Sequence, residues 1–196
     1  MNLYKISFLL LLLCCLFVIP LKMIGQEDIE QKIKYLIDLH KAHPDSDSVL
    51  MYLDTALIYA DSLKSRSLEA EINRHYGNYY YHNDKAKAVT YYKKAKETYV
   101  LLNDTLSTSI CLSKLGNTYY RLLNLDTAKL YYEKTISYKK ILQDTNGIAI
   151  GYNGMGLVAK QKGNYEEAID NFLKAVKFLQ KERSKGIVLM LSLIHI

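Results

Sequence analysis

Small and aromatic residues recur along the middle of the chain with a period of 39 to 40 residues. Ala88, Ala128 and Ala168 are each followed four residues later by an aromatic side chain. Apolar positions within each copy lie three or four residues apart, which is the spacing of one face of an α-helix. The pattern therefore predicts antiparallel helix pairs over residues 66–102, 106–143 and 146–183.

Two further units are expected at the ends of this array. Ile29 and Ile33 share one helical face and a proline-containing turn follows, so residues 27–63 are interpreted as a degenerate first unit. Residues 186–189 repeat the pattern of residues 147–150, so a fifth unit is expected to begin at residue 186.

The recurring residues resemble the tetratricopeptide repeat, in which a Leu-Gly pair, a Tyr, an Ala, an aromatic residue and a second Ala mark two antiparallel helices. The positions that carry the resemblance are Gly77, Ala88, Tyr92, Gly116, Tyr119, Ala128, Tyr132, Gly156, Ala168, Phe172 and Ala175. The resemblance implies an all-α fold, a right-handed α-solenoid of about four antiparallel helix pairs, in one repeat domain over residues 26–190. The period is longer than the roughly 34 residues usual in this family, which implies longer helices or linkers.

Stacking gives the small residues a physical role. A helix pair cannot bury its apolar stripe alone, so each pair lies against the next, and glycine and alanine occupy the places where helices approach. A bulky side chain at such a place overpacks the contact by about 1 to 3 kcal/mol. We therefore expect Ala128→Leu to lower the melting temperature and Lys129→Leu to leave it unchanged.

The same resemblance implies a ligand groove along the first helix of each unit. The residues expected to point into it are Arg74, Asn78, Tyr81, Asn117, Tyr120, Arg121, Asn153 and Lys160, with Glu71, His82, Ile110, Ser113, Ile150, Leu157 and Gln161 beside them. Amides and guanidinium groups bind peptide backbone or carboxylates, and tyrosines add apolar area with a polar tip, so the mixture suits an extended peptide. The alternative is that these are ordinary solvated helix residues. The third unit lacks the basic residues with which chaperone-binding members hold a C-terminal carboxylate, so that clamp is not expected.

Both ends of the chain are expected to lie outside the repeat domain. Residues 6–21 form an uncharged apolar run after Lys5, which is typical of a signal peptide over residues 1–25, although Met23 makes a poor cleavage site and an uncleaved anchor stays open. Residues 191–196 resemble the translation of a transposon-end sequencing adapter, so they are interpreted as an artefact, and the natural gene is expected to continue beyond Met190.

The charge, the cysteines and the histidines of the chain do not indicate a catalytic or metal-binding site. The formal net charge is +6, and the densest basic stretch, residues 85–96, is interpreted as a solvated helix face rather than a nucleic-acid track. Cys111 is the one cysteine outside the leader and is expected to be a small buried residue. The histidine pairs His40/His43 and His75/His82 lack completing ligands, so no metal and no cofactor are expected.

The sequence therefore predicts a non-catalytic protein that binds another protein or a peptide outside the cytoplasm, in the periplasm or at the membrane. No phosphate-binding loop, zinc-protease motif or nucleophile elbow is present. The alternative is the sensory half of a membrane-anchored regulator, whose histidine kinase or DNA-binding output would follow the repeats. Nucleic acid is not an expected partner.

Overall fold

The computed structural model describes residues 26–38 and 48–194, and all the regular secondary structure in these ranges is helical. The all-α fold class predicted from the sequence is confirmed. The expected signal peptide, the histidines at 40 and 43, and residues 195–196 lie outside the described residues. The chain divides into two compact units, and the division falls between Ile72 and Asn73; we call them the N-terminal and C-terminal units.

The N-terminal unit contains the helix over residues 26–38, helix α2 (Val49–Ser62) and the first part of helix α3 (Arg66–Asn83). Its buried side chains recur at helical spacing on each element, because only one face of each helix turns away from solvent. They are Ile33, Ile37, Leu53, Ala56, Ala60, Ala70 and Ile72.

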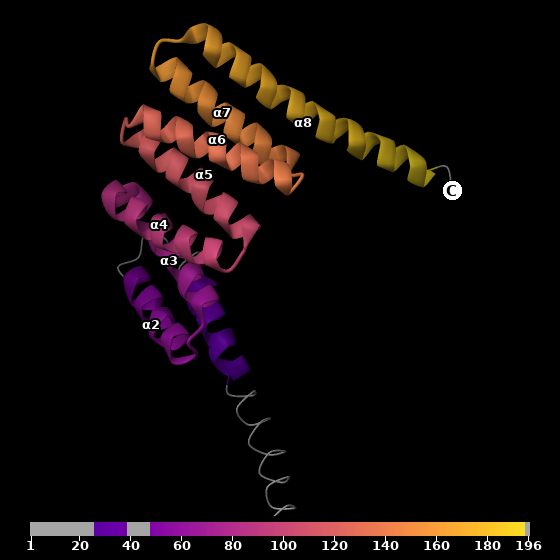
Figure 1. Ribbon diagram of the computed structural model, residues 1–196. Coiled ribbons are helices and arrows are strands. Elements are labelled where there is room, and N and C mark those ends of the chain that lie inside the picture. The colour runs from indigo at the N-terminus through magenta and orange to yellow at the C-terminus, as the bar shows by residue number, and fades with distance from the viewer. Residues whose placement is uncertain (1–25, 39–47, 195–196) are drawn as a thin grey trace, which may run out of the picture. The chain divides into compact units, whose positions relative to one another are not determined.

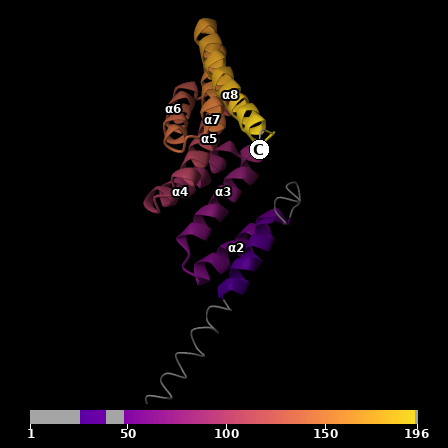
Figure 2. The same cartoon turned by 90° about the vertical axis from the view of Figure 1, so that its right-hand side faces the viewer.

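The C-terminal unit continues α3 and adds five helices, of which each contacts the next (Figures 1 and 2). They are α4 (Lys85–Leu101), α5 (Thr105–Arg121), α6 (Leu125–Ile141), α7 (Thr145–Gln161) and α8 (Tyr165–Ile194). We call α3, α5 and α7 first helices and α4, α6 and α8 second helices, so that α3–α4, α5–α6 and α7–α8 are the helix pairs.

The turns between these helices share one construction. From α4 onward, each turn holds a residue in the left-handed backbone region, such as Asn103 at φ 56° and Gly163 at φ 80°, which reverses the chain in few residues. The next residue caps the following helix: the Asp104 side chain accepts a hydrogen bond from the Ser107 N–H at 2.9 Å, and Asn124 and Asp144 act in the same way. Short turns of this kind place consecutive helices antiparallel.

The turn between α3 and α4 is shorter than the others. α3 ends at Asn83 and α4 begins at Lys85, so Asp84 alone connects them and caps α4 through the Lys87 N–H at 3.0 Å. No residue of this turn has a positive φ. The shorter connection accounts for the mixed period of 39 and 40 residues, because it lies between the glycine and the alanine of its copy.

The core of the C-terminal unit is built on aromatic rings from the second helices. Tyr132 is 1% exposed and packs with Ala128 of its own helix and Val158 of α7. The space for the ring comes from glycines: a Cβ atom at Gly116 or Gly154 would lie 2.9 Å or 2.4 Å from its carbon atoms. The Tyr132 ring therefore fills the volume that glycines of two first helices, α5 and α7, leave open.

The same arrangement explains the glycines of the repeat. A Cβ atom at Gly77 would meet Tyr92 at 2.5 Å, and one at Gly156 would meet Phe172 at 2.6 Å. The sequence predicted that these glycines let helices approach each other, but it did not show that an aromatic ring is what they accommodate. Among the other repeat positions, Ala88, Ala168 and Ala175 are buried and Tyr119 is half-buried.

Helix α8 differs from the sequence expectation. A turn and the start of a fifth unit were predicted near residue 186, whereas α8 continues from Tyr165 to Ile194. Arg183 and Ser184 stand at the offsets of the left-handed residue and its cap, and the stretch Lys181-Glu182-Arg183 consists of good helix formers. The helix therefore has no strong signal to stop.

Candidate functional site

The side chains predicted for a ligand groove lie on the first helices of the C-terminal unit. We call the solvent-reaching side chains of residues 73–83, α5 and α7 the first-helix face. Arg74, Asn78, Tyr81, Asn117 and Tyr120 are half-buried, whereas Arg121, Asn153 and Lys160 are exposed. Half-buried polar groups are positioned by the fold and still within reach of a ligand.

Two asparagines of this face are held by tyrosines of the core. The Tyr92 hydroxyl donates a hydrogen bond to Asn78 Oδ1 at 2.8 Å, and the Tyr132 hydroxyl donates one to Asn117 Oδ1 at 2.8 Å. Burial is the main cause that raises the pKa of both phenols, so each hydroxyl keeps its proton and acts as a donor. The two bonds link each second helix to the first helix of its own pair.

The third helix pair lacks this hydrogen bond. Leu157 stands at the offset of the two asparagines, and Phe172 stands at the offset of the two tyrosines. A phenylalanine ring has no hydroxyl that needs a partner, so the leucine leaves no polar group unsatisfied. The hydroxyl and the amide are thus present together or absent together.

Further tyrosines surround the two asparagines. Tyr81 lies close enough to contribute, after burial, to the raised pKa of both Tyr92 and Tyr132. The Arg121 guanidinium carbon lies 4.8 Å from the centre of the Tyr81 ring, in a cation–π contact. The structure therefore brings the predicted residues of α3 and α5 together in one cluster. We find no contact between that cluster and the exposed Asn153 or Lys160 within the described part of the chain.

Lys114 belongs to this face, although the sequence analysis did not name it. Its side chain is half-buried on α5. Burial lowers the pKa of Lys114, and the positive charge of Arg74 lowers it further. The signal that could have identified it is its offset, because Lys114 aligns with Gly154, which packs against an aromatic ring.

The first-helix segments that belong to the C-terminal unit carry no acidic residue, whereas the part of α3 before residue 73 carries Glu69 and Glu71. Residues 73–83, α5 and α7 contain Arg74, Lys114, Arg121 and Lys160 but no Asp or Glu. The acidic residues lie on the second helices or at helix caps, where several pair with lysines, as Glu167 Oε1 does with Lys129 Nζ at 2.7 Å. The first-helix face is therefore electropositive.

Lysines of the basic stretch on α4 lie over tyrosine rings. Tyr80 and Tyr91 stack with ring centroids 5.5 Å apart, and Lys87 and Lys94 lie over these rings at 5.1 Å and 5.5 Å. Tyr119 and Tyr131 repeat the stack one pair later at 5.4 Å. These lysines cover tyrosine rings of their own protein, in line with the interpretation of this stretch as a helix surface.

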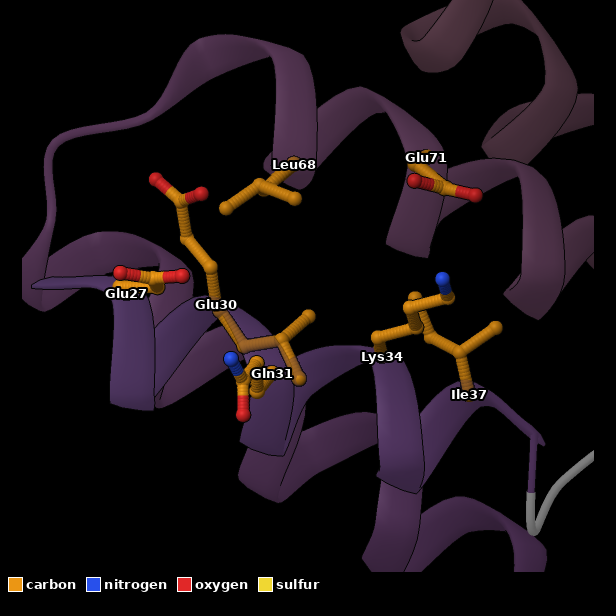
Figure 3. Close-up of a pocket in the computed structure, with 8 residues that line it drawn as sticks. Glu27, Glu30, Gln31, Lys34, Ile37, Leu68 and Glu71 are labelled. Carbon is orange, nitrogen blue, oxygen red and sulfur yellow. The ribbon is translucent and has the colours of Figure 1, made fainter.

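The N-terminal unit contains a separate pocket of about 400 Å³ (Figure 3). Ile33, Ile37 and Leu68 supply apolar surface. The polar lining is mainly acidic and consists of Glu27, Glu30, Gln31, Lys34 and Glu71. Among the polar lining residues, the sequence analysis named only Glu71 as a groove position. The other four polar residues lie on the helix over residues 26–38, for which the sequence analysis assigned no groove positions.

The cysteine and the two histidines that the structure describes do not form a reactive or metal-binding site within the described residues. Cys111 is buried, and burial raises the pKa of its thiol to about 12. His75 is buried and His82 is exposed. In the ranges that the structure describes, no group of three His, Cys, Asp or Glu residues is placed to hold a metal ion, and none of the helices is long and apolar enough to cross a membrane.

Comparisons with known proteins agree with this architecture. Residues 149–178 match the tetratricopeptide repeat family. No curated protein matches the sequence. The matched segment begins inside α7 and ends inside α8, so it covers the turn of the third helix pair and the parts of both helices next to that turn.

Solved structures share the fold at low sequence identity. BtubC (BKLC) from P. vanneervenii is 18% identical with a TM-score of 0.68, over 76% of this chain and 62% of its own. Aspartyl phosphate phosphatase F from Bacillus subtilis is 17% identical with a TM-score of 0.71, over 93% of this chain and 48% of its own. MamA is 24% identical with a TM-score of 0.51, over 83% of this chain and 95% of its own.

The chain thus spans less than two thirds of the length of the first two structures. At these identities the likeness concerns the fold and not the activity. The family match, the paired helices with glycines opposite aromatic rings, and the shared fold agree: the chain contains a tetratricopeptide repeat over residues 149–178 and has a helical-repeat fold.

Proposed function

We propose that this protein is a non-catalytic scaffold whose first-helix face binds an extended segment of a partner protein. The observation that carries the proposal is the cluster of half-buried amides and tyrosines on α3 and α5, fixed by hydrogen bonds from the core. A face that only needed to be soluble would not require buried tyrosines to position its amides.

The chemistry of the cluster suits a peptide. Asparagine amides bind the polar groups of an extended backbone, and tyrosines provide contact area with little loss of rotamer freedom. Their positions are set by helices rather than loops, which reduces the entropic cost of ordering the site on binding. Lys160 and Asn153 extend the polar surface along α7.

We also propose an exported location, in the periplasm or at the membrane, on the basis of the apolar run over residues 6–21. The alternative role as the sensory half of a membrane-anchored regulator requires the same binding face and an additional output domain. Sequencing the intact gene beyond Met190 separates the two roles. An apolar span of about 20 residues followed by a kinase or DNA-binding domain supports the regulator, and a stop codon supports the free scaffold.

A peptide-display experiment tests the binding role. A random 12-residue library is selected on the full-length chain, and recovered peptides are titrated by fluorescence anisotropy against the wild type and Tyr120→Ala. A matched control, Tyr138→Ala, removes a half-buried tyrosine of the second helix α6. The proposal expects Tyr120→Ala to weaken binding about tenfold and the control to change it less than about twofold. Recovery of no peptide, or equal effects of both variants, would contradict it.

A further inference from the structure

We infer that helix α8 packs against α8 of a second copy of this chain, antiparallel and about a two-fold axis near Phe172. The surface that makes the contact consists of Ile169, Leu173, Val176 and Leu179, and we call it the α8 stripe. It lies on a second helix rather than on the first-helix face, so the inference goes beyond the proposed function and does not depend on it.

Helix α8 is covered on one side only. Ala168, Asn171 and Ala175 are buried where α8 packs on α7, the helix beside it in Figures 1 and 2. The four side chains of the α8 stripe are 46% to 63% exposed, although all of them are apolar. They follow one another at intervals of three or four residues, so they form a continuous line along the helix. Among the described helices, none covers this line.

Two stripe positions are buried in the preceding helix pair. Val176 and Leu179 correspond to Ile136 and Lys139 of α6. Ile136 and Lys139 are 6% and 9% exposed because α7 packs against them. The contact is close, since a Cβ atom at Gly151 of α7 would lie 2.4 Å from the Ile136 side chain. Val176 and Leu179 therefore stand at positions that the repeat uses to contact a neighbouring helix.

The other two stripe positions distinguish a second copy from a further repeat. Ile169 and Leu173 correspond to Lys129 and Glu133 of α6. Glu133 is exposed, and Lys129 reaches solvent while it pairs with Glu167. A helix pair stacked on α8 as α7–α8 is stacked on α6 would thus leave Leu173 exposed and Ile169 partly exposed. An occupant that covers all four side chains must lie along the stripe itself, as an antiparallel copy of α8 does.

The charges beside the stripe favour the antiparallel arrangement. Acidic residues precede basic ones along this flank, in the order Glu166, Asp170, Lys174 and Lys177. Asp170 pairs with Lys174 at 2.5 Å. Glu166 and Lys177 are exposed, and neither makes an ion pair within the described residues. A two-fold axis perpendicular to α8 brings the same flank of both copies to one side of the contact, where Glu166 of each copy meets Lys177 of the other.

Sedimentation velocity of the full-length chain over a range of concentrations tests the dimer. Wild type is expected to show a monomer–dimer equilibrium, and Leu173→Glu is expected to weaken it at least about tenfold, because it places a charge in the middle of the contact. The matched control Leu130→Glu changes a 48% exposed leucine of α6 and is expected to alter the dissociation constant less than about twofold. Circular-dichroism melts report whether both variants remain folded. A monomeric wild type, or equal effects of the two variants, would overturn the inference.

Glu166→Lys and Lys177→Glu test the antiparallel arrangement. Each variant alone places like charges opposite each other at both contacts and is expected to weaken the dimer about tenfold. An equimolar mixture of the two is expected to form a heterodimer about as tight as the wild-type dimer, because each charge then meets an opposite one. The control Glu133→Lys makes the same change on α6 and is expected to leave dimerisation unchanged. A mixture that stays monomeric, or an equal loss from Glu133→Lys, would overturn the arrangement.

The product of the intact gene, read beyond Met190, supplies the last comparison. If that product dimerises and Leu173→Glu disrupts its dimer, the inference stands. If that product is monomeric, the chain's own continuation covers the α8 stripe and the inference fails. Tyr120→Ala, which tests the proposed peptide binding, is expected to leave the dimer unchanged, and loss of the dimer in that variant would contradict the separation of the two surfaces.

Discussion

The α5–α6 and α7–α8 helix pairs have the same architecture but fill one pair of positions differently. In α5–α6, the Tyr132 hydroxyl bonds to Asn117, and in α7–α8 a phenylalanine and a leucine, Phe172 and Leu157, stand at the same offsets. The α3–α4 pair agrees with α5–α6. The chain thus buries an aromatic ring next to a first helix in two ways, with a hydroxyl–amide hydrogen bond in two pairs and without one in the third.

The difference shows what the polar pair is for. Phe172 beside Gly156 shows that a ring can fill this position without a hydrogen bond, so packing alone does not require the hydroxyl. The hydroxyl instead fixes an amide at the surface in the pairs that also carry Tyr81 and Arg121. The proposed function assigns the tyrosine–asparagine pairs to ligand binding and the phenylalanine–leucine pair to packing.

The largest effect is expected where the Tyr132 ring meets α7. A Cβ atom at Gly154 would lie 2.4 Å from the ring, so Gly154→Leu must displace it and is expected to cost about 3 kcal/mol of unfolding free energy. The neighbouring exposed position provides the control, since Asn153→Leu is expected to change stability by less than about 0.5 kcal/mol. Urea titrations measure both values. Similar costs would show that the ring does not fill the seam between α6 and α7.

The second-largest effect on stability is expected at the hydrogen-bonded pair of Tyr132 and Asn117. Asn117→Leu leaves the buried Tyr132 hydroxyl without its acceptor and is expected to cost about 1 to 3 kcal/mol. Adding Tyr132→Phe recreates the Leu157–Phe172 combination of the last pair and is expected to recover most of that loss. A double-mutant cycle by chemical denaturation measures the coupling, and additive losses would contradict the comparison.

A smaller, pH-dependent effect is expected at the cap of α7. Lys139 Nζ lies 2.7 Å from Asp144 Oδ2, and this hydrogen bond, followed by that from the Gly147 N–H, lowers the pKa of Asp144. A lowered carboxyl pKa stabilises the fold above the pKa of the unfolded chain, and that contribution disappears as the pH falls through the folded value.

The melting temperature of the wild type is therefore expected to exceed that of Asp144→Asn near neutral pH, and the difference is expected to shrink as the pH falls below the carboxyl pKa of the unfolded chain and through the lowered pKa of the folded state. Because the Asp144 side chain is 34% exposed, solvent screening limits the gap to about 1 kcal/mol or less. Melting curves at a series of pH values measure it. A gap that is constant across the series would exclude the ion pair as its cause. In α8 the position of Lys139 is occupied by Leu179, so no such dependence is expected there.

The smallest effect is expected at the ion pair between α6 and α8. Lys129 and Glu167 are 37% and 39% exposed, so Lys129→Leu is expected to cost between zero and about 1 kcal/mol. Ala128→Leu, at a fully buried neighbour, is expected to cost about 1 to 3 kcal/mol. Thermal melts compare the two directly. A larger loss from Lys129→Leu would reverse the assignment of buried and exposed faces.

The sequence predicted the helical fold because small and aromatic residues recur at one period. It did not predict the partner of each glycine: Gly154 is absent from the repeat pattern, yet it faces the Tyr132 ring as Gly116 does. The asparagines were identified by offset alone, but their hydrogen bonds join residues 14 and 15 positions apart on different helices. Lys114 was missed because its pKa depends on burial and on Arg74, and neither is visible without coordinates.

The most direct test of the account follows the side-chain amide signals of Asn117 and Asn78 by ¹H–¹⁵N NMR during titration with a peptide recovered by display. Asn171, whose Nδ2 donates to the Glu167 carbonyl at 2.9 Å on α8, serves as the internal reference. The account predicts that the NH₂ resonances of Asn117 and Asn78 shift with saturation and that those of Asn171 do not. Binding that shifts Asn171 and leaves Asn117 and Asn78 unchanged would contradict it.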